Sequence, residues 1–266
     1  METYPAVVKI MMDAIRKASK AVIRDFYEVE NLQVSKKGAR EFVTSADLKA
    51  ESILIAELQK AREGYCVLSE EAGFIKGSDD EYCWIIDPID GTNNFMHGFP
   101  YFCITIGLEK KLPNGQREII AGVTEAPILK ETFWAAKGLG AWLETANATG
   151  ATRLRVSSRS KLSESLLAVG SFSTDIKEGV DITKEFMATR CIGSTALAIA
   201  YTAAGKFDCF IHNGAKPWDI AAGVLLISEA KGVVSDINGK KKMFEKNSII
   251  ASNADIEPLF MKNFVK

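Results

Sequence analysis

The segment from Cys83 to Phe95 constrains the fold more than any other, because it joins a buried strand to a turn that the strand cannot continue through. Cys83 to Ile86 form an apolar run that is typical of a buried strand. Pro88 has no backbone N–H, so regular ladder pairing should end just after Asp87. Asp87 is therefore expected at the mouth of a strand.

Two carboxylates and a backbone cradle meet in this segment. Asp90 follows Asp87 closely enough to turn back toward it, Gly91 lets the backbone approach a ligand, and Thr92 offers a hydroxyl beside an expected helix start. Two carboxylates buried together repel each other, and a divalent cation resolves that repulsion. The alternative is an acidic turn with a helix cap. The flanking Trp-Ile-Ile and Gly-Thr favour the cation site.

Four segments, in a fixed order, resemble the signatures of one enzyme family. They run from Glu41 to Asp47 with Glu51, from Leu68 to Gly73, from Trp84 to Phe95 and from Lys216 to Gly223. Together they resemble the inositol monophosphatase family, among the lithium-sensitive, magnesium-dependent phosphomonoesterases, and come closest to its bacterial SuhB type. The four segments cover nearly the whole chain, so the match is far more specific than any single motif.

Composition agrees with a globular enzyme. The chain has 266 residues, of which 47% are hydrophobic, and we expect one domain over 1–266 made of two closely packed halves, about 1–150 and 151–266. With 33 basic and 34 acidic side chains, it has no global field that would gather nucleic acid or anionic membranes. The segment from Met1 to Pro5 does not resemble a signal peptide, and no apolar run approaches the ~20 residues of a membrane span. These features favour a cytoplasmic protein.

Apolar periodicity predicts alternating helices and strands. A long amphipathic helix is expected over the first ~25 residues, and a second helix from about Ala46 with Leu48 and Leu58 on its apolar side. An Asn-Gly turn predicts a hairpin near residues 102–124, and the second half reads as helices layered on another sheet. The five cysteines lack any Cys-x-x-Cys spacing and are expected to be buried free thiols. The resemblance implies an α+β fold, the layered αβαβα sandwich of the sugar phosphatases, with the site between the two halves.

The residue types indicate metal-assisted hydrolysis. Oxygen ligands without histidine or cysteine favour Mg²⁺ over Zn²⁺, and such a cation can neutralise phosphate charge and activate water. The resemblance implies that Glu70, Asp87 and the carbonyl of Ile89 hold a first ion. It implies that Asp87, Asp90 and Asp219 hold a second. A helix cap is the alternative role for Asp219.

The resemblance also implies catalytic and phosphate-binding groups. Asp47 would accept a hydrogen bond from Thr92 and, together with Glu70, would orient and deprotonate the attacking water. The backbone N–H groups of Gly91 and Thr92, next to Asp90, would meet the phosphate. Lys36 stands where the family has a phosphate-side lysine, although it could equally be a solvated charge.

Substrate recognition is expected in two places. The segment from Arg190 to Ala196 resembles the family's substrate loop, which would bring Gly193, Ser194 and Thr195 to the hydroxyls; its alternative is a glycine turn before a helix. His212 stands where inositol monophosphatases usually carry a glutamate that binds an inositol hydroxyl. The substrate is therefore expected to be inositol 1-phosphate or a related small polyol phosphate. His97 is expected to be a surface or packing residue.

Other activities are less compatible with the motifs. Relatives acting on 3′-phosphoadenosine 5′-phosphate or histidinol phosphate typically carry a basic residue where this chain has Asn93, and fructose 1,6-bisphosphate stays open as a substrate. A haloacid-dehalogenase phosphatase needs Asp-x-Asp, and no phosphate-binding P-loop is present. SuhB-type proteins also act as RNA-related regulators bound to transcription machinery, which keeps such partners open; the run Lys240 to Lys242 is better explained as a solvated turn. Family habit implies a homodimer.

Overall fold

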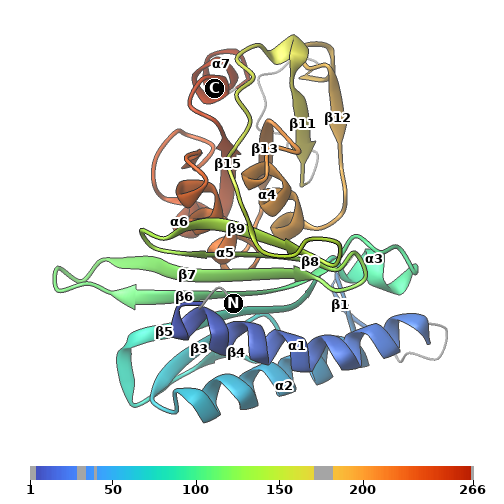
Figure 1. Cartoon of the computed structure of the whole chain (residues 1–266), viewed down its shortest axis with the longest axis vertical. Coiled ribbons are helices and arrows are strands. Elements are labelled where there is room, and N and C mark those ends of the chain that lie inside the picture. Colours follow the sequence, from blue (N-terminus) through green and yellow to red (C-terminus); the bar gives the residue numbers. More distant parts are fainter. Residues whose placement is uncertain (1–3, 29–33, 39–40, 171–181, 265–266) are drawn as a thin grey trace.

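The chain folds into two large sheets with helices packed against them (Figure 1). The computed structural model describes residues 4–28, 34–38, 41–170 and 182–264, without the side chains of 34–38, 41–43 and 183. The helices are α1 Ala6–Tyr27, α2 Ser45–Ala61, α3 Thr92–Met96, α4 Thr195–Ala203, α5 Pro217–Glu229, α6 Met243–Lys246 and α7 Ile256–Phe264, with short 3₁₀ turns at Leu162–Glu164 and Ile182–Lys184.

The strands fall into a small hairpin and the two large sheets. The hairpin pairs β1 Val34–Gly38 with β2 Glu41–Thr44. The eight-stranded sheet has the order β10-β9-β8-β7-β6-β5-β3-β4 and the five-stranded sheet has the order β12-β11-β13-β15-β14. Their bounds are β3 Tyr65–Ser69, β4 Gly73–Ile75, β5 Asp79–Asp90, β6 Cys103–Lys111, β7 Arg117–Ala126, β8 Glu131–Ala136, β9 Gly140–Thr145, β10 Thr152–Arg153, β11 Leu166–Val169, β12 Ala188–Arg190, β13 Cys209–Asn213, β14 Val233–Ser235 and β15 Ser248–Ser252.

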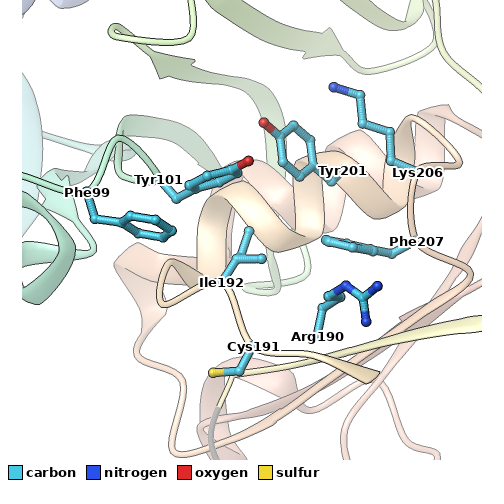
Figure 2. Close-up of a pocket in the computed structure, with 8 residues that line it drawn as sticks. All are labelled: Phe99, Tyr101, Arg190, Cys191, Ile192, Tyr201, Lys206 and Phe207. Atoms are coloured by element: carbon cyan, nitrogen blue, oxygen red, sulfur yellow. The ribbon is translucent and has the colours of Figure 1, made fainter. Parts of the chain in front are cut away.

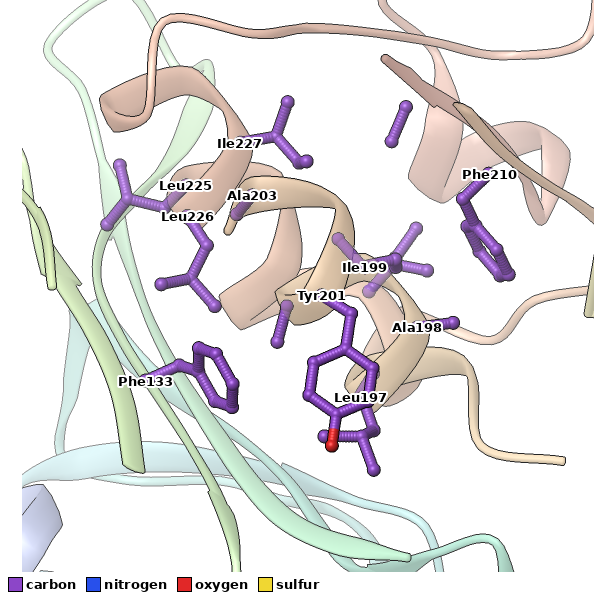
Figure 3. Packing of buried hydrophobic residues seen from close by; sticks show 14 of the residues in the cluster. Phe133, Leu197, Ala198, Ile199, Tyr201, Ala203, Phe210, Leu225, Leu226 and Ile227 are labelled. Carbon is purple, nitrogen blue, oxygen red and sulfur yellow. The ribbon is translucent and has the colours of Figure 1, made fainter. Parts of the chain in front are cut away.

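Five layers result from this arrangement. Helices α1 and α2 lie side by side on one face of the eight-stranded sheet, and α4 and α5 lie between the two sheets (Figure 1). Helix α7 packs on the outer face of the five-stranded sheet. In the central layer, the ring of Tyr201 in α4 packs against Phe133 of β8 with ring centroids 5.8 Å apart, and Leu197 and Leu226 belong to the same buried cluster (Figure 3). The expected α+β sandwich is confirmed, and the central helix layer joins its two sheets.

The ladder between β5 and β6 is interrupted around Pro88, as the sequence predicted. Its ladder with β6 is regular up to Asp87 and resumes at Asp90, with a register shift between them. Pro88 lies in that irregular stretch, where a missing N–H costs no ladder bond. The strand runs further in both directions than the expected Cys83 to Ile86, while Ile85 and Ile86 face the two different cores.

Helix α5 approaches the eight-stranded sheet unusually closely. A Cβ atom added at Gly107 of β6 would lie 2.7 Å from Ala221 Cβ, and one added at Gly122 of β7 would lie 2.8 Å from Ala222 Cα. Real Cβ atoms essentially never come so close, so α5 can pack at this distance from the sheet only because both positions are glycine. The first turn of α5, which carries Asp219, is thereby held against the sheet.

Two expectations about single residues were wrong. Leu48 is 53% exposed, because it lies on a different face of α2 from the buried stripe of Ala46, Ala50, Leu54 and Leu58. Cys191 is exposed, whereas Cys66, Cys83, Cys103 and Cys209 are buried, and all are free thiols. None of the helices in the described part of the chain combines the length and the apolar character that a membrane span requires.

Candidate metal and phosphate site

Parallel pairing of β3 and β5 brings two acidic segments to one sheet edge. The regular pairs run from Cys66 and Cys83 to Ser69 and Ile86, so the last residue of β3 lies beside Ile86 while β5 continues to Asp90. Glu70 follows β3 directly, and its N–H donates to the Ile86 carbonyl at 3.2 Å. Glu70 and Asp87 therefore each follow one residue of this last pair, at the carboxyl end of β3, where α/β sheets commonly bind ligands.

Three aspartates from distant parts of the chain form one cluster. Asp87, Asp90 and Asp219 each offer a carboxylate oxygen, and these oxygens all lie within 4.8 Å of one another. Asp87 and Asp90 flank the irregular stretch of β5, and Asp219 comes from the first turn of α5. The sequence-predicted turn of Asp90 back toward Asp87 is thus present, and the central helix layer supplies the third carboxylate.

A backbone N–H holds one oxygen of each clustered aspartate. Asp87 Oδ1 accepts from Ile89 N at 3.0 Å, and Asp219 Oδ2 accepts from Lys216 N at 2.8 Å. Asp90 Oδ2 accepts from Ala196 N at 2.7 Å. The second oxygen of each carboxylate can therefore face a cation. Asp219 also fulfils the helix-cap role, so the two alternatives for this residue are compatible.

The electrostatics of the cluster fit a hard cation. Burial raises the pKa of Asp87 well above its usual value, and the neighbouring charges of Glu70, Asp90 and Asp219 raise it further. Burial and the charge of Asp90 likewise raise the pKa of Asp219 well above its usual value. Because like charges are held together away from water, a divalent cation bound by oxygen ligands would relieve the repulsion.

Thr92 and Asp47 meet as the sequence predicted. Thr92 Oγ1 lies 3.3 Å from Asp47 Oδ1 and 3.1 Å from the carbonyl of Ile89. Asp47 Oδ2 accepts from Thr44 N at 2.8 Å and from the Thr44 hydroxyl, in a capping box at the start of α2. Burial raises the pKa of Asp47, although hydrogen bonds from Thr44 and Thr92 oppose the shift. A carboxylate with a raised pKa is a better proton acceptor.

The expected substrate loop is tied directly to the acidic cluster. Ser194 donates its hydroxyl to Asp90 Oδ2 and also accepts from Leu197 N as the cap of α4. Gly193 has φ 78°, a left-handed conformation that favours glycine. The glycine turn before a helix is therefore present, and its cap binds a candidate metal ligand.

Asn94 is a residue whose role sequence reasoning missed. Its side-chain N–H groups donate to the carbonyls of Tyr101 and Ile192 at 2.6 and 2.7 Å, joining the signature segment to the substrate loop. A Cβ added at Gly193 would lie 2.7 Å from this amide. The doubled asparagine after Asp-Gly-Thr was the available signal, and it was used only to distinguish family branches.

His212 sits at the end of β13, facing the substrate loop. Its Nδ1 lies 2.8 Å from Thr195 Oγ1, and its ring packs over Gly170, where an added Cβ would lie 2.3 Å from the ring. Burial lowers the pKa of His212, so the neutral imidazole is favoured around neutral pH.

The remaining residues singled out in the sequence lie in β1, around α3 and in an exposed turn. Lys36 lies in β1, but its side chain is outside the described part of the chain, so its role stays a prediction. Gly91 has φ 100° and immediately precedes α3. His97 is exposed at the end of α3, as expected for a surface residue. Lys240 to Lys242 are exposed, as expected for a solvated turn.

A pocket of about 430 Å³ shares a wall with the substrate loop. Arg190, Cys191 and Ile192 form this wall, and the rings of Phe99, Tyr101, Tyr201 and Phe207 line much of the rest (Figure 2). Lys206 reaches its rim and pairs with Glu131 at 2.6 Å. No local pattern in the sequence predicts this pocket, because its aromatic residues come from separate segments.

The family comparison decides the identity. The sequence model of the inositol monophosphatase family matches residues 4–266. The chain belongs to the inositol monophosphatase family. It is therefore a phosphatase of a family that acts on small phosphate esters, and its acidic cluster is suited to a metal.

Individual relatives agree with this family membership. An inositol-1-monophosphatase from Mesorhizobium japonicum is 41% identical, over 97% of this chain and 95% of the relative. The Nus factor SuhB of Pseudomonas aeruginosa is 36% identical, over 93% of this chain and 91% of the relative. The crystal structure of the extragenic suppressor protein SuhB from Bartonella henselae is 38% identical, with a TM-score of 0.88 over 97% of this chain and 98% of that one. This member of the inositol monophosphatase family thus shares its whole fold with SuhB proteins.

Proposed function

We propose that this phosphatase is a Mg²⁺-dependent phosphomonoesterase that hydrolyses inositol 1-phosphate or a related small polyol phosphate. The observation that carries the proposal is the cluster of Asp87, Asp90 and Asp219, whose oxygens converge within 4.8 Å. Carboxylate and carbonyl oxygens are the ligands that Mg²⁺ prefers. The similarity to a protein named inositol-1-monophosphatase supports the substrate class.

Two cation positions follow from the ligand set. Glu70, Asp87 and the Ile89 carbonyl would hold one ion, and Asp87, Asp90 and Asp219 would hold the other. Bound there, Mg²⁺ would neutralise phosphate charge and acidify a water molecule. Asp87 belongs to both sets, since the charges of both Glu70 and Asp90 act on its carboxyl group and raise its pKa.

The protein's own groups would orient the attack. Glu70 and the Thr92 hydroxyl would bind the attacking water, and Asp47 would take up its proton through Thr92, whose Oγ1 lies 3.3 Å from Asp47 Oδ1. The N–H groups of Gly91 and Thr92 would donate to phosphate oxygens. Lys36 would add a positive charge on the phosphate side.

Substrate hydroxyls would be recognised by the loop of Gly193, Ser194 and Thr195 together with His212. The hydrogen bond between Thr195 and His212 links the loop to β13, so both sides of this subsite are fixed together. His212 offers a neutral ring in place of a carboxylate, which favours substrates that need no anionic acceptor there.

The test is a phosphate-release screen with Mg²⁺ and with excess EDTA. Its substrates are inositol 1-phosphate, glycerol 2-phosphate, fructose 1,6-bisphosphate, nucleoside monophosphates, 3′-phosphoadenosine 5′-phosphate and histidinol phosphate. We expect Mg²⁺-dependent release from the small polyol phosphates, with inhibition by Li⁺ that persists at saturating substrate. Release that is unchanged in EDTA would exclude the proposed chemistry, and a preference for another substrate would change only the proposed specificity.

A regulatory role is the second candidate function, supported by the similarity to a protein named Nus factor SuhB. Such a role would involve RNA or the transcription machinery and would not need the cation ligands. Asp90→Asn and Asp219→Asn separate the two candidates. Cellular function that survives the loss of hydrolysis would favour regulation. A cytoplasmic homodimer remains our prediction for either role, to be checked by fractionation and by light scattering.

A further inference from the structure

Glu51 is a buried carboxylate that takes no part in the proposed chemistry. It lies in α2 one helical turn after Asp47, so the two side chains project from the same face of the helix. Only 5% of Glu51 is exposed. A carboxylate removed from water to this extent needs hydrogen-bond donors.

Three donors meet at one oxygen of Glu51. Its Oε1 accepts from the hydroxyl of Ser69, from Glu71 N at 3.0 Å and from Ala72 N at 3.1 Å. These groups form the turn between β3 and β4, and they bracket Glu70 on both sides. The turn is thus tied to the helix that also carries Asp47.

The turn between β3 and β4 also carries Glu70, whose carboxylate is repelled by the aspartates of the acidic cluster. The charge of Glu70 contributes to the raised pKa values of both Asp87 and Asp219, so Glu70 faces like charges. The N–H of residue 70 donates to the Ile86 carbonyl at 3.2 Å, which ties the backbone of the turn to β5. Repulsion among these carboxylates favours moving Glu70 away from Asp87 before a cation binds, and the hydrogen bonds to Glu51 oppose such a movement of the turn without depending on the cation.

We propose that Glu51 is a positioning residue that holds the β3–β4 turn so that Glu70 faces the cation site. Glu51 itself binds neither cation nor substrate. The inference rests on the proposed function, because the placement of Glu70 matters only if the acidic cluster binds a cation. Ligand-orienting partners of this kind typically change metal affinity by about 10–100-fold.

The test compares three variants in a Mg²⁺ titration by calorimetry, without substrate. Glu51→Ala removes the anchor, and Glu51→Gln keeps an amide oxygen that can accept the same bonds. Asp208→Ala is the matched control. Asp208 is 2% exposed and accepts from Leu166 N at 2.6 Å, but it precedes β13 whereas His212 lies toward the far end of that strand.

We expect Glu51→Ala to bind Mg²⁺ about 10–100-fold more weakly than wild type and Glu51→Gln to stay within about fivefold. Asp208→Ala should lose thermal stability while keeping its Mg²⁺ affinity. The double variant Glu51→Ala with Glu70→Gln should bind little worse than Glu70→Gln alone, because Glu51 acts through Glu70. Should Glu51→Ala not fold, Ser69→Ala replaces it, with an expected loss of about two- to tenfold.

The outcomes that contradict the inference are distinct from a failure of the proposed function. Equal Mg²⁺ affinities for Glu51→Ala and wild type, or additive losses in the double variant, would overturn the positioning role alone. Wild-type protein that binds no Mg²⁺ would overturn the proposed function and the positioning role with it.

Discussion

The clustered aspartates are anchored by backbone N–H groups, which makes asparagine a mild structural replacement. In Asp90→Asn and Asp219→Asn the amide oxygen can still accept from Ala196 N or Lys216 N. Each change removes one of the like charges and, with it, a ligand charge for the cation. These two variants should therefore keep the fold while they lose affinity for the cation.

For Asp90→Asn and Asp219→Asn we expect Mg²⁺-dependent turnover to fall by more than about 100-fold, because a bound cation supplies several kcal/mol of transition-state stabilisation. Stability in EDTA should stay the same or rise, because repulsion is relieved. Phosphate release and thermal unfolding in EDTA measure the two effects. Unchanged turnover in both variants would remove these residues from the ligand set.

His212 allows a prediction about selectivity. His212→Glu should raise kcat/KM for inositol 1-phosphate relative to glycerol 2-phosphate by about 2–10-fold, since one restored hydroxyl contact is worth about 0.5–1.5 kcal/mol. His97→Glu, at the exposed end of α3, serves as the control. Because burial lowers the pKa of His212, the wild-type ratio should change only on acidification. A ratio that neither His212→Glu nor acidification alters would show that His212 does not contact the substrate.

At the scale of elements, the placement of α5 depends on glycines in the sheet beneath it. Asp219 reaches Asp87 because α5 lies against β6 and β7 without intervening side chains at Gly107 and Gly122. A helix raised by the width of a methyl group would move its carboxylate away from the cluster. The glycines of β6 and β7 thus help to set the position of Asp219 through one helix–sheet contact.

Gly122→Val should destabilise the fold by about 1–3 kcal/mol, because the added atoms collide with α5. It should also weaken Mg²⁺ binding, since Asp219 is displaced. Urea unfolding and calorimetry measure the two effects. Gly150→Val is the control, because an added Cβ meets nothing within 4 Å there, and it should change stability by less than about 0.5 kcal/mol. Equal stability and equal Mg²⁺ affinity of the two variants would show that the close contact at Gly122 affects neither the fold nor the position of Asp219.

At the scale of the whole molecule, the acidic cluster joins the eight-stranded sheet to the central helix layer. Asp87 and Asp90 belong to the eight-stranded sheet, while Asp219 and the donor Ala196 N come from the helix layer that also packs on the five-stranded sheet. Cation binding should therefore stabilise the molecule as a unit. At a Mg²⁺ concentration of 100 times the Kd, the gain should be about 2.7 kcal/mol.

The pH dependence of this stability should reverse between metal-free and Mg²⁺-bound protein. The folded-state pKa values of Asp87 and Asp219 are raised by burial and neighbouring charge, so their contribution to stability is present at low pH and is lost as pH rises through those values. With Mg²⁺ the ionised forms are required, so stability gained from binding should grow with pH. Thermal unfolding from about pH 5 to about pH 8, compared with Asp219→Asn, isolates the contribution. Identical pH profiles with and without Mg²⁺ would contradict it.

Local sequence was sufficient for most of the elements and for the chemistry of the site. Periodicity and the Asn-Gly turn placed α1, the hairpin of β6 and β7, and the start of α2 within one residue of Ser45, because the side chains that determine these features are close together in the chain. The prediction that Leu48 lies on the apolar side of α2 was wrong, since Leu48 is two residues from both Ala46 and Ala50 and therefore points away from their buried face. The acidic pair Asp87 and Asp90 was readable because a single turn brings the two together.

Tertiary structure alone decided how the distant groups meet. Asp219 joins the cluster through the packing of α5 on Gly107 and Gly122, and Glu51 reaches the Glu70 turn through the packing of α2 beside β3. The lowered pKa of His212 likewise comes from burial beneath segments far away in sequence. Residue types and spacing determine which chemistry a segment can perform. Distances between segments arise from close packing of the layers, which no local pattern encodes.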